Sequence, residues 1–315
     1  MTYRTDQDAR VIRRLDAAIS ALIAAVIALD VVLGAALGFR VEWTTFGIPA
    51  LATAAALTGA VVYGRWRPDE RLATACMGTA QLVAFTAAGA PLSYIAASAG
   101  LPLQDDVFAA IDAALGFDWV WLFQVMDRWS ALQPLFSVPY GSMLPQIAVM
   151  TLALGFFGRH LELRLFLLAF ALAALSTVAA SAVVPAVGPP LHYNIEALGL
   201  ALKTATGTQH VAVFEGLRDG SIRTLVGLGT EGLICMPSLH AASAVLLMRA
   251  GLVLPVLRWP FVAINALMLF STVIEGSHYL ADVLAGVALA FAAERAARAI
   301  AKAAARDRVR ATALA

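Results

Sequence analysis

Charged residues are scarce in this chain. Lysine, arginine, aspartate and glutamate make up 14% of its 315 residues and hydrophobic residues 61%, with a mean hydropathy of +0.80. A soluble domain carries about 25% charged residues, so this chain has too few to cover a soluble surface of its size. The formal net charge of +1 provides no field for a polyanion, which excludes nucleic acid as a partner. The composition predicts an all-α, polytopic helical bundle embedded in a lipid bilayer.

Cysteine and histidine are also rare, with two and five residues. The spans described below put Cys76 and Cys235 near opposite membrane faces, so we expect no disulfide, and we expect Cys235 to serve packing. Because so few sulfur, imidazole and carboxylate groups lie close together, we expect no metal ion and no other cofactor.

Eight stretches are apolar and long enough, or nearly so, to cross a bilayer, which takes about 20 residues. They cover roughly residues 16–38, 43–64, 72–99, 138–158, 164–186, 237–257, 260–276 and 278–298. A cytoplasmic N-terminus puts 17 of the 22 basic residues in the cytoplasm, as the positive-inside rule requires. Both termini are then cytoplasmic, on the inner or plasma membrane if the source is bacterial. The predicted parts are an N-terminal helical pair (1–71), a six-helix core (72–298) and a basic cytoplasmic tail (299–315).

Two long segments fall on the outer side. Residues 100–137 predict an amphipathic helix lying in the interface, with Trp119, Trp121 and Trp129 as an aromatic belt and with solvated carboxylates. Residues 187–236 form a polar segment too long for a passive linker. Asp30 lies alone in the first span, and we expect it to make a buried interhelical hydrogen bond.

Two histidines open apolar helices at the outer side. His240 lies in CMPSLHAASA, where Pro237 suits the first helical position and Ser238 and His240 share the first turn. The unpaired N–H groups and positive end of such a helix favour an anion, of which phosphate is the obvious one. His278 opens EGSHYLADVLAG, and Asp282 lies four residues later on the same face. A buried carboxylate orients an imidazole and stabilises its positive charge, which suits a nucleophile or base.

A satisfied structural His–Asp pair is the alternative, but ionisable groups within membranes are costly and usually functional. The motifs P-S-x-H at 237–240 and H-Y-x-x-D at 278–282 resemble the type 2 phosphatidic acid phosphatase superfamily, over about 72–298. The resemblance implies phosphoryl transfer through a phosphohistidine on His278, oriented by Asp282. It also implies that His240 protonates the leaving group and then activates the acceptor.

The segments GPPLHYN, HYLADVLAG and LRDG are most similar to the branch that contains inositol phosphorylceramide synthases and their bacterial relatives. The chain departs from the broader family in its cations. SAVVPAVGPPLHYN carries no basic residue where the first motif has two, and Ser271 and Thr272 stand where the third motif has Ser-Arg.

A phosphomonoester carries nearly two charges and calls for several lysines or arginines, whereas a diester carries one. The site therefore suits a diester or recruits cations from the loop. We expect Arg218, beside an Asp-Gly turn, to contact the substrate. Arg223, Lys203, His192 and Ser238 complete the candidate substrate-binding residues.

The predicted function is thus phosphoryl transfer on a membrane lipid at the extracytoplasmic face. Water as acceptor makes a lipid phosphatase, and an alcohol makes a head-group phosphotransferase. A transporter that uses Asp30, Glu275 and Asp282, and a catalytically inactive lipid-binding relative, are the alternatives. The lipid, the acceptor and the oligomeric state do not follow from the sequence.

Overall fold

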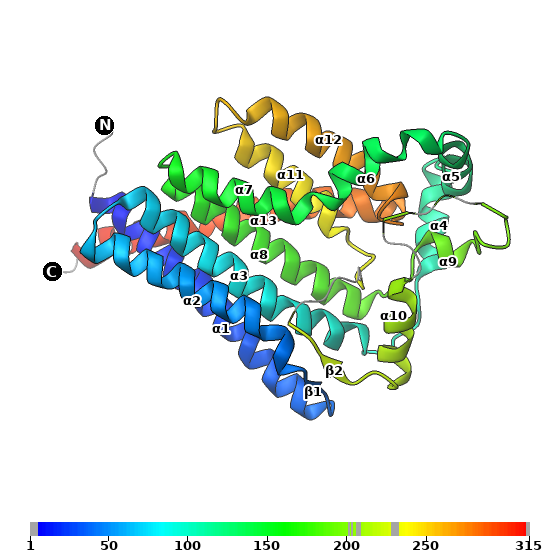
Figure 1. Ribbon diagram of the computed structural model, residues 1–315, viewed down its shortest axis with the longest axis horizontal. Helices are drawn as coiled ribbons and strands as arrows, with labels where there is room; N and C mark the ends of the chain where they lie inside the picture. Colours follow the sequence, from blue (N-terminus) through cyan, green and yellow to red (C-terminus); the bar gives the residue numbers. More distant parts are fainter. Residues whose placement is uncertain (1–5, 201, 203, 206–208, 228–232, 313–315) are drawn as a thin grey trace.

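The computed structural model describes the chain apart from residues 1–5, 201, 203, 206–208, 228–232 and 313–315. The bundle consists of long helices that lie side by side (Figure 1): α1 (Asp6–Ala36), α2 (Gly47–Val61), α3 (Glu70–Ala97), α7 (Met143–Phe156), α8 (His160–Val183), α11 (Leu239–Gly251), α12 (Arg258–Ile274) and α13 (Leu280–Thr312). Shorter helices at one end connect them: α4 (Asp105–Ala114), α5 (Trp119–Arg128), α6 (Gln133–Gly141), α9 (Pro189–His192) and α10 (Gln209–Asp219). The all-α fold predicted from composition is confirmed.

Four helical stretches are long and apolar enough to cross a membrane: α1, Trp43–Trp66 with α2 at its centre, α3 and α8. A fifth is possible if α6 and α7, bent by 47° at Ser142, form one span. Helices α11 and α12 are apolar but shorter, and α13 carries Asp282, Glu294 and a basic second half. Each of the eight predicted spans is therefore helical, although only four or five qualify by length and composition.

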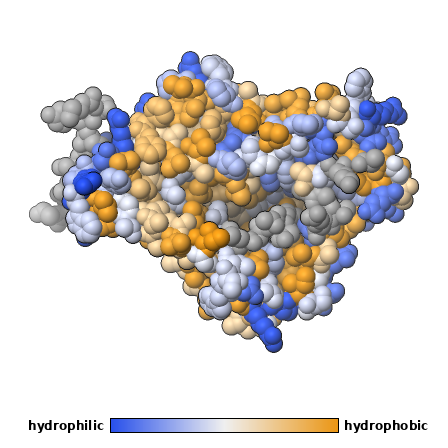
Figure 2. Space-filling view, in the orientation of Figure 1, coloured by the Kyte–Doolittle hydropathy of each residue, from blue (hydrophilic) through white to orange (hydrophobic). Residues whose placement is uncertain are grey.

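The outside of the bundle is strongly apolar. Val31, Leu51 and Leu144 are among many large hydrophobic side chains that are exposed on α1, α2 and α7. Figure 2 shows hydrophobic residues over much of the bundle, with hydrophilic ones gathered toward its ends. Lipid would cover such a surface, which agrees with a multi-pass membrane protein.

The start of α1 and the end of α13 lie together at one end of the bundle (Figure 1). The Arg14 guanidinium donates a hydrogen bond to the Ala304 carbonyl oxygen, 2.6 Å away. This proximity is what an even number of crossings requires, and the cytoplasmic assignment of this end stays a prediction.

The connecting segments depart from expectation in two places. Strand β1 (Arg40–Val41), between α1 and α2, pairs in parallel with β2 (Thr224–Leu225), so the long polar segment is tied to the N-terminal helices. Trp119 is buried and its Nε1 donates to the Val273 carbonyl oxygen at 3.1 Å. The interfacial belt is therefore wrong for Trp119, because α5 packs across the end of α12, whereas Trp121 and Trp129 are exposed.

Candidate active site

The first histidine motif begins α11 with a serine cap. Ser238 is the N-cap residue, and its Oγ accepts a hydrogen bond from the Ala241 N–H at 3.3 Å. Pro237 thus lies outside the helix, and its expected place at the first helical position is wrong. The fully buried Ser238 hydroxyl therefore caps the helix, and the expected substrate contact stays a prediction. His240 lies in the first turn.

A close helix contact joins the two motifs. The Ser238 N–H donates to the Asp282 carbonyl oxygen at 3.0 Å. A Cβ atom on Gly286 would lie only 2.3 Å from the Ser238 carbonyl oxygen, so α13 can approach the start of α11 only with glycine at this position. The distant motifs therefore meet where their helices begin.

His278 and Asp282 form a buried pair. His278 Nδ1 lies 3.3 Å from Asp282 Oδ2, and both side chains are almost fully excluded from solvent. The same oxygen accepts the Tyr279 backbone N–H at 3.0 Å. Because Nδ1 faces the carboxylate, Nε2 is the ring nitrogen left to meet a substrate. Ser277, immediately before, has a left-handed backbone (φ 56°), a costly conformation for serine that is typical of functional sites.

Tyr140 lies beside both imidazoles. Its ring stacks on His240 with centroids 4.0 Å apart and planes 13° from parallel. A Cβ atom on Gly276 would lie 2.7 Å from the Tyr140 ring and 2.8 Å from the His278 ring. Tyr140 thus contacts His240 directly, and Gly276 packs closely against both the Tyr140 ring and the His278 ring. Nothing in the sequence distinguished Tyr140 from other apolar residues of its span.

Cys235 belongs to the same cluster. Its Sγ lies 3.0 Å from Asp282 Oδ2 and 3.9 Å from His278 Nδ1. Burial, and then the Asp282 carboxylate, raise the pKa of the Cys235 thiol well above its usual value, so the thiol keeps its proton and donates it to Asp282. The expectation that Cys235 serves only packing is wrong, because the loop before α11 crosses the start of α13.

Cys235, His278 and Asp282 also place three potential metal-ligand atoms within 4.8 Å of one another. The same three side chains form the hydrogen-bond network described above, in which Cys235 and His278 both contact Asp282. Both cysteines are free, as expected.

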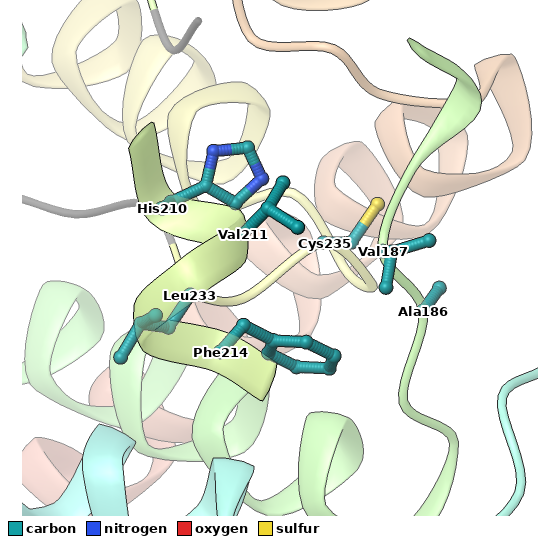
Figure 3. A pocket seen from close by; sticks show the side chains of 7 residues that line it. All are labelled: Ala186, Val187, His210, Val211, Phe214, Leu233 and Cys235. Atoms are coloured by element: carbon teal, nitrogen blue, oxygen red, sulfur yellow. The ribbon is translucent and has the colours of Figure 1, made fainter. Parts of the chain in front are cut away.

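A small pocket adjoins Cys235 (Figure 3). It is lined by Ala186, Val187, His210, Val211, Phe214 and Leu233 together with the cysteine, and its volume is about 10 Å³. Such a volume holds about one water molecule and no phosphate group.

Two buried aspartates of α4 hold the loop and helix around His278. Asp112 accepts hydrogen bonds from the Leu280 and Ala281 N–H groups, both at 2.9 Å, and so caps the first turn of α13. Asp105 accepts from the Gly188 N–H at 2.9 Å and from the Tyr279 hydroxyl at 3.0 Å. Burial raises the pKa of Asp112, although its two backbone donors lower it.

The expectation that these carboxylates are solvated is therefore wrong for Asp105 and Asp112, which are 6% and 1% exposed. It holds for Asp106, whose side chain is 99% exposed. The sequence feature that could have predicted their burial is the seven-residue spacing of Asp105 and Asp112, which puts both on one helical face.

Replacement of Asp112 by alanine should destabilise the protein. The change leaves one buried and one partly buried N–H group at the start of α13 without their acceptor, at a cost of about 1–3 kcal/mol. We expect a lower melting temperature in detergent, measured by thermal unfolding of the purified protein. Asp106→Ala, six residues earlier in α4 and exposed, is the matched control and should leave the melting temperature unchanged. Equal melting temperatures for both variants would contradict the capping role.

The two loop arginines that the structure describes bond to backbone carbonyl oxygens. Arg218 Nη2 donates to the Leu101 carbonyl oxygen at 2.7 Å, and its guanidinium lies over the Phe214 ring. Arg223 donates to the Leu217 carbonyl oxygen at 2.7 Å, at the end of α10. Both arginines therefore hold α10 and its neighbours. In the part of the chain that the structure describes, Arg218 Nη1 is buried without a hydrogen-bond partner.

The remaining candidates differ in position. Lys203 lies outside the described residues. His192 lies near the site, since its ring meets the Tyr279 ring edge-on with centroids 6.2 Å apart. The Ser271 and Thr272 hydroxyls, at the positions of the family's Ser-Arg, bond to carbonyl oxygens one turn earlier in α12. Neither hydroxyl compensates for the missing cation.

The apolar bundle and two histidines at joined helix starts define a multi-pass membrane protein with an enzyme-like site. Residues 106–296 match the PAP2 superfamily. The chain therefore belongs to this superfamily, that of the type 2 phosphatidic acid phosphatases. Membership supports a phosphatase-type enzyme that transfers phosphoryl groups of lipid-type phosphates in general. No curated protein and no solved structure matches the chain.

Proposed function

We propose that this protein transfers the phosphoryl group of a membrane phospholipid through a covalent intermediate on His278. The observation that carries the proposal is the contact of His278 Nδ1 with Asp282, which leaves Nε2 for attack, beside a second imidazole at the start of α11. Superfamily membership supports the same chemistry.

The reaction has two steps. His278 Nε2 attacks phosphorus and the bond to the leaving oxygen breaks, while His240 donates a proton to that oxygen. His240 then removes a proton from the acceptor hydroxyl, whose oxygen attacks phosphorus and breaks the phosphorus–nitrogen bond. Asp282 accepts the Nδ1–H hydrogen bond and stabilises the positive imidazole of the intermediate. Cys235 and the Tyr279 N–H fix the orientation of that carboxylate.

The charge around the site favours a phosphodiester substrate and an alcohol acceptor. Among the described residues, no hydrogen bond or ion pair joins an arginine or lysine to His240, His278 or Asp282. A diester needs to have only one negative charge matched, and the N–H groups of a helix start can supply much of that. The likeness of GPPLHYN and HYLADVLAG to inositol phosphorylceramide synthases points to the same head-group phosphotransferase chemistry.

A substrate panel tests this function. Purified protein is incubated with lipid phosphomonoesters and phosphodiesters, with and without lipid or polyol alcohols, and both hydrolysis and transfer products are quantified. We expect turnover of diesters that increases with added alcohol and yields a new diester. Turnover of monoesters alone would overturn the diester assignment, and no turnover of any lipid would favour the inactive relative.

Arg218→Ala provides the second test of the charge argument. We expect kcat/KM for the diester to change less than about threefold, because the guanidinium is bound to Leu101. A charged hydrogen bond to substrate phosphate would be worth about 1.5–3 kcal/mol, which corresponds to a loss of tenfold or more. A loss of that size, only partly restored in Arg218→Lys, would show that Arg218 contacts the substrate phosphate after all.

A further inference from the structure

A second, larger cavity lies between α1, α2 and α3. Its volume is about 470 Å³, within the range of roughly 300–1,000 Å³ that is typical of ligand sites. The lining is almost wholly apolar and includes Ile27, Trp43, Phe46, Leu57 and Pro91. None of the residues of the candidate active site lines this cavity, and all of its lining residues except Leu225 precede the matched region.

Asp30 is the single ionisable residue in this lining. Its side chain comes from α1 and is only 8% exposed. Within the described part of the chain its Oδ1 is buried without a hydrogen-bond partner, so the expected interhelical hydrogen bond of this oxygen is absent. An unpaired carboxylate oxygen among apolar groups costs several kcal/mol, and an acid within a membrane helix usually has a ligand or a partner.

The cavity is open to the apolar outer surface of the bundle, because its lining residues Ile27, Val31 and Trp43 are half exposed or more. Helix α2 supplies Leu57 and other lining residues. That helix buries only Pro49 and Ala60, so its remaining side chains would contact acyl chains in a bilayer. An occupant can therefore enter sideways from the membrane with its chain already in lipid, and it loses little solvation on entry.

We propose that this cavity binds a long-chain amphiphile whose head donates a hydrogen bond to Asp30. The apolar walls accommodate the chain, and the carboxylate oxygen selects a head with an N–H or O–H donor, an ammonium or a hydroxyl. A carboxylate head is disfavoured because it offers no hydrogen-bond donor when ionised. The site is independent of phosphoryl transfer at His278.

Trp43 lines the cavity and reports its occupancy. Purified full-length protein in detergent is titrated with a brominated hexadecylamine, because bromine quenches nearby indole fluorescence. Unlabelled hexadecylamine, hexadecanol and hexadecanoate then compete. We expect saturable quenching that is lost in Trp43→Phe, competition by the amine or the alcohol, and at least tenfold weaker competition by the carboxylate.

Substitutions locate the head group. Asp30→Asn should weaken binding of the amine about tenfold or more, the value of one charged hydrogen bond, and Ala54→Phe should block the cavity. Asp106→Asn, an exposed aspartate outside the cavity, should leave binding unchanged. Wild-type affinity in Asp30→Asn, or equal competition by all three chains in the wild-type protein, would overturn the proposal. The competition series needs no variant, so it decides the question even where Asp30→Asn fails to fold.

Discussion

His278→Ala should abolish phosphoryl transfer while the protein still folds and inserts. The variant lacks the nitrogen that would form the covalent intermediate, and loss of such a group costs about 10⁴-fold or more in turnover. The measurement is product formation from the most active diester, alongside thermal unfolding in detergent. Asp282→Asn should lose less than His278→Ala, because it disturbs orientation and charge but keeps the attacking atom.

Two controls separate chemistry from folding. His278→Gln fills more of the space vacated by the ring and should be as inactive as His278→Ala. His160→Gln changes a buried histidine whose Nδ1 lies 2.7 Å from the Thr74 hydroxyl, far in sequence from both motifs. We expect this variant to lose stability but to keep its turnover per folded molecule. Full activity in His278→Ala would remove the proposed mechanism. Because a variant can lose activity simply by unfolding, the activity of each variant is normalised to its folded fraction.

His240→Ala should slow both steps by about 10²–10⁴-fold, the contribution of a positioned acid or base. With a substrate whose leaving group needs no protonation, the first step should recover and the second should not. The covalent intermediate on His278 should then accumulate, visible as an added mass that is lost in acid.

Tyr140→Phe is the matched control for this variant, because it keeps the ring that stacks on His240. We expect it to retain most of the activity, whereas Tyr140→Ala should lower kcat as the imidazole loses its support. An unmodified protein and unimpaired kcat in His240→Ala would exclude His240 as the acid and base.

The sequence by itself determined the class of protein. A chain with so little charge can be soluble only in lipid, and in lipid every backbone group must bond within a helix or a closed barrel, so eight apolar stretches predicted eight helices. The spacing of His278 and Asp282 predicted their contact, which the structure shows, although the shared helical face is wrong because α13 begins only at Leu280. Pro237 predicted a helix start near His240, although the helix begins after Pro237 and not at it.

The tertiary structure alone decided what surrounds those histidines. Asp112 caps α13 from a helix nearly 170 residues earlier in the chain, and Cys235 and Tyr140 reach the pair across other helix contacts. Such partners depend on how the helices cross, and the hydrophobic periodicity of each helix does not predict that. The same holds for the loop arginines, since Arg218 and Arg223 bind nearby carbonyl oxygens and not the site that their charge suggested. Charge in a sequence shows what a residue can bind, whereas packing decides which partner comes within reach.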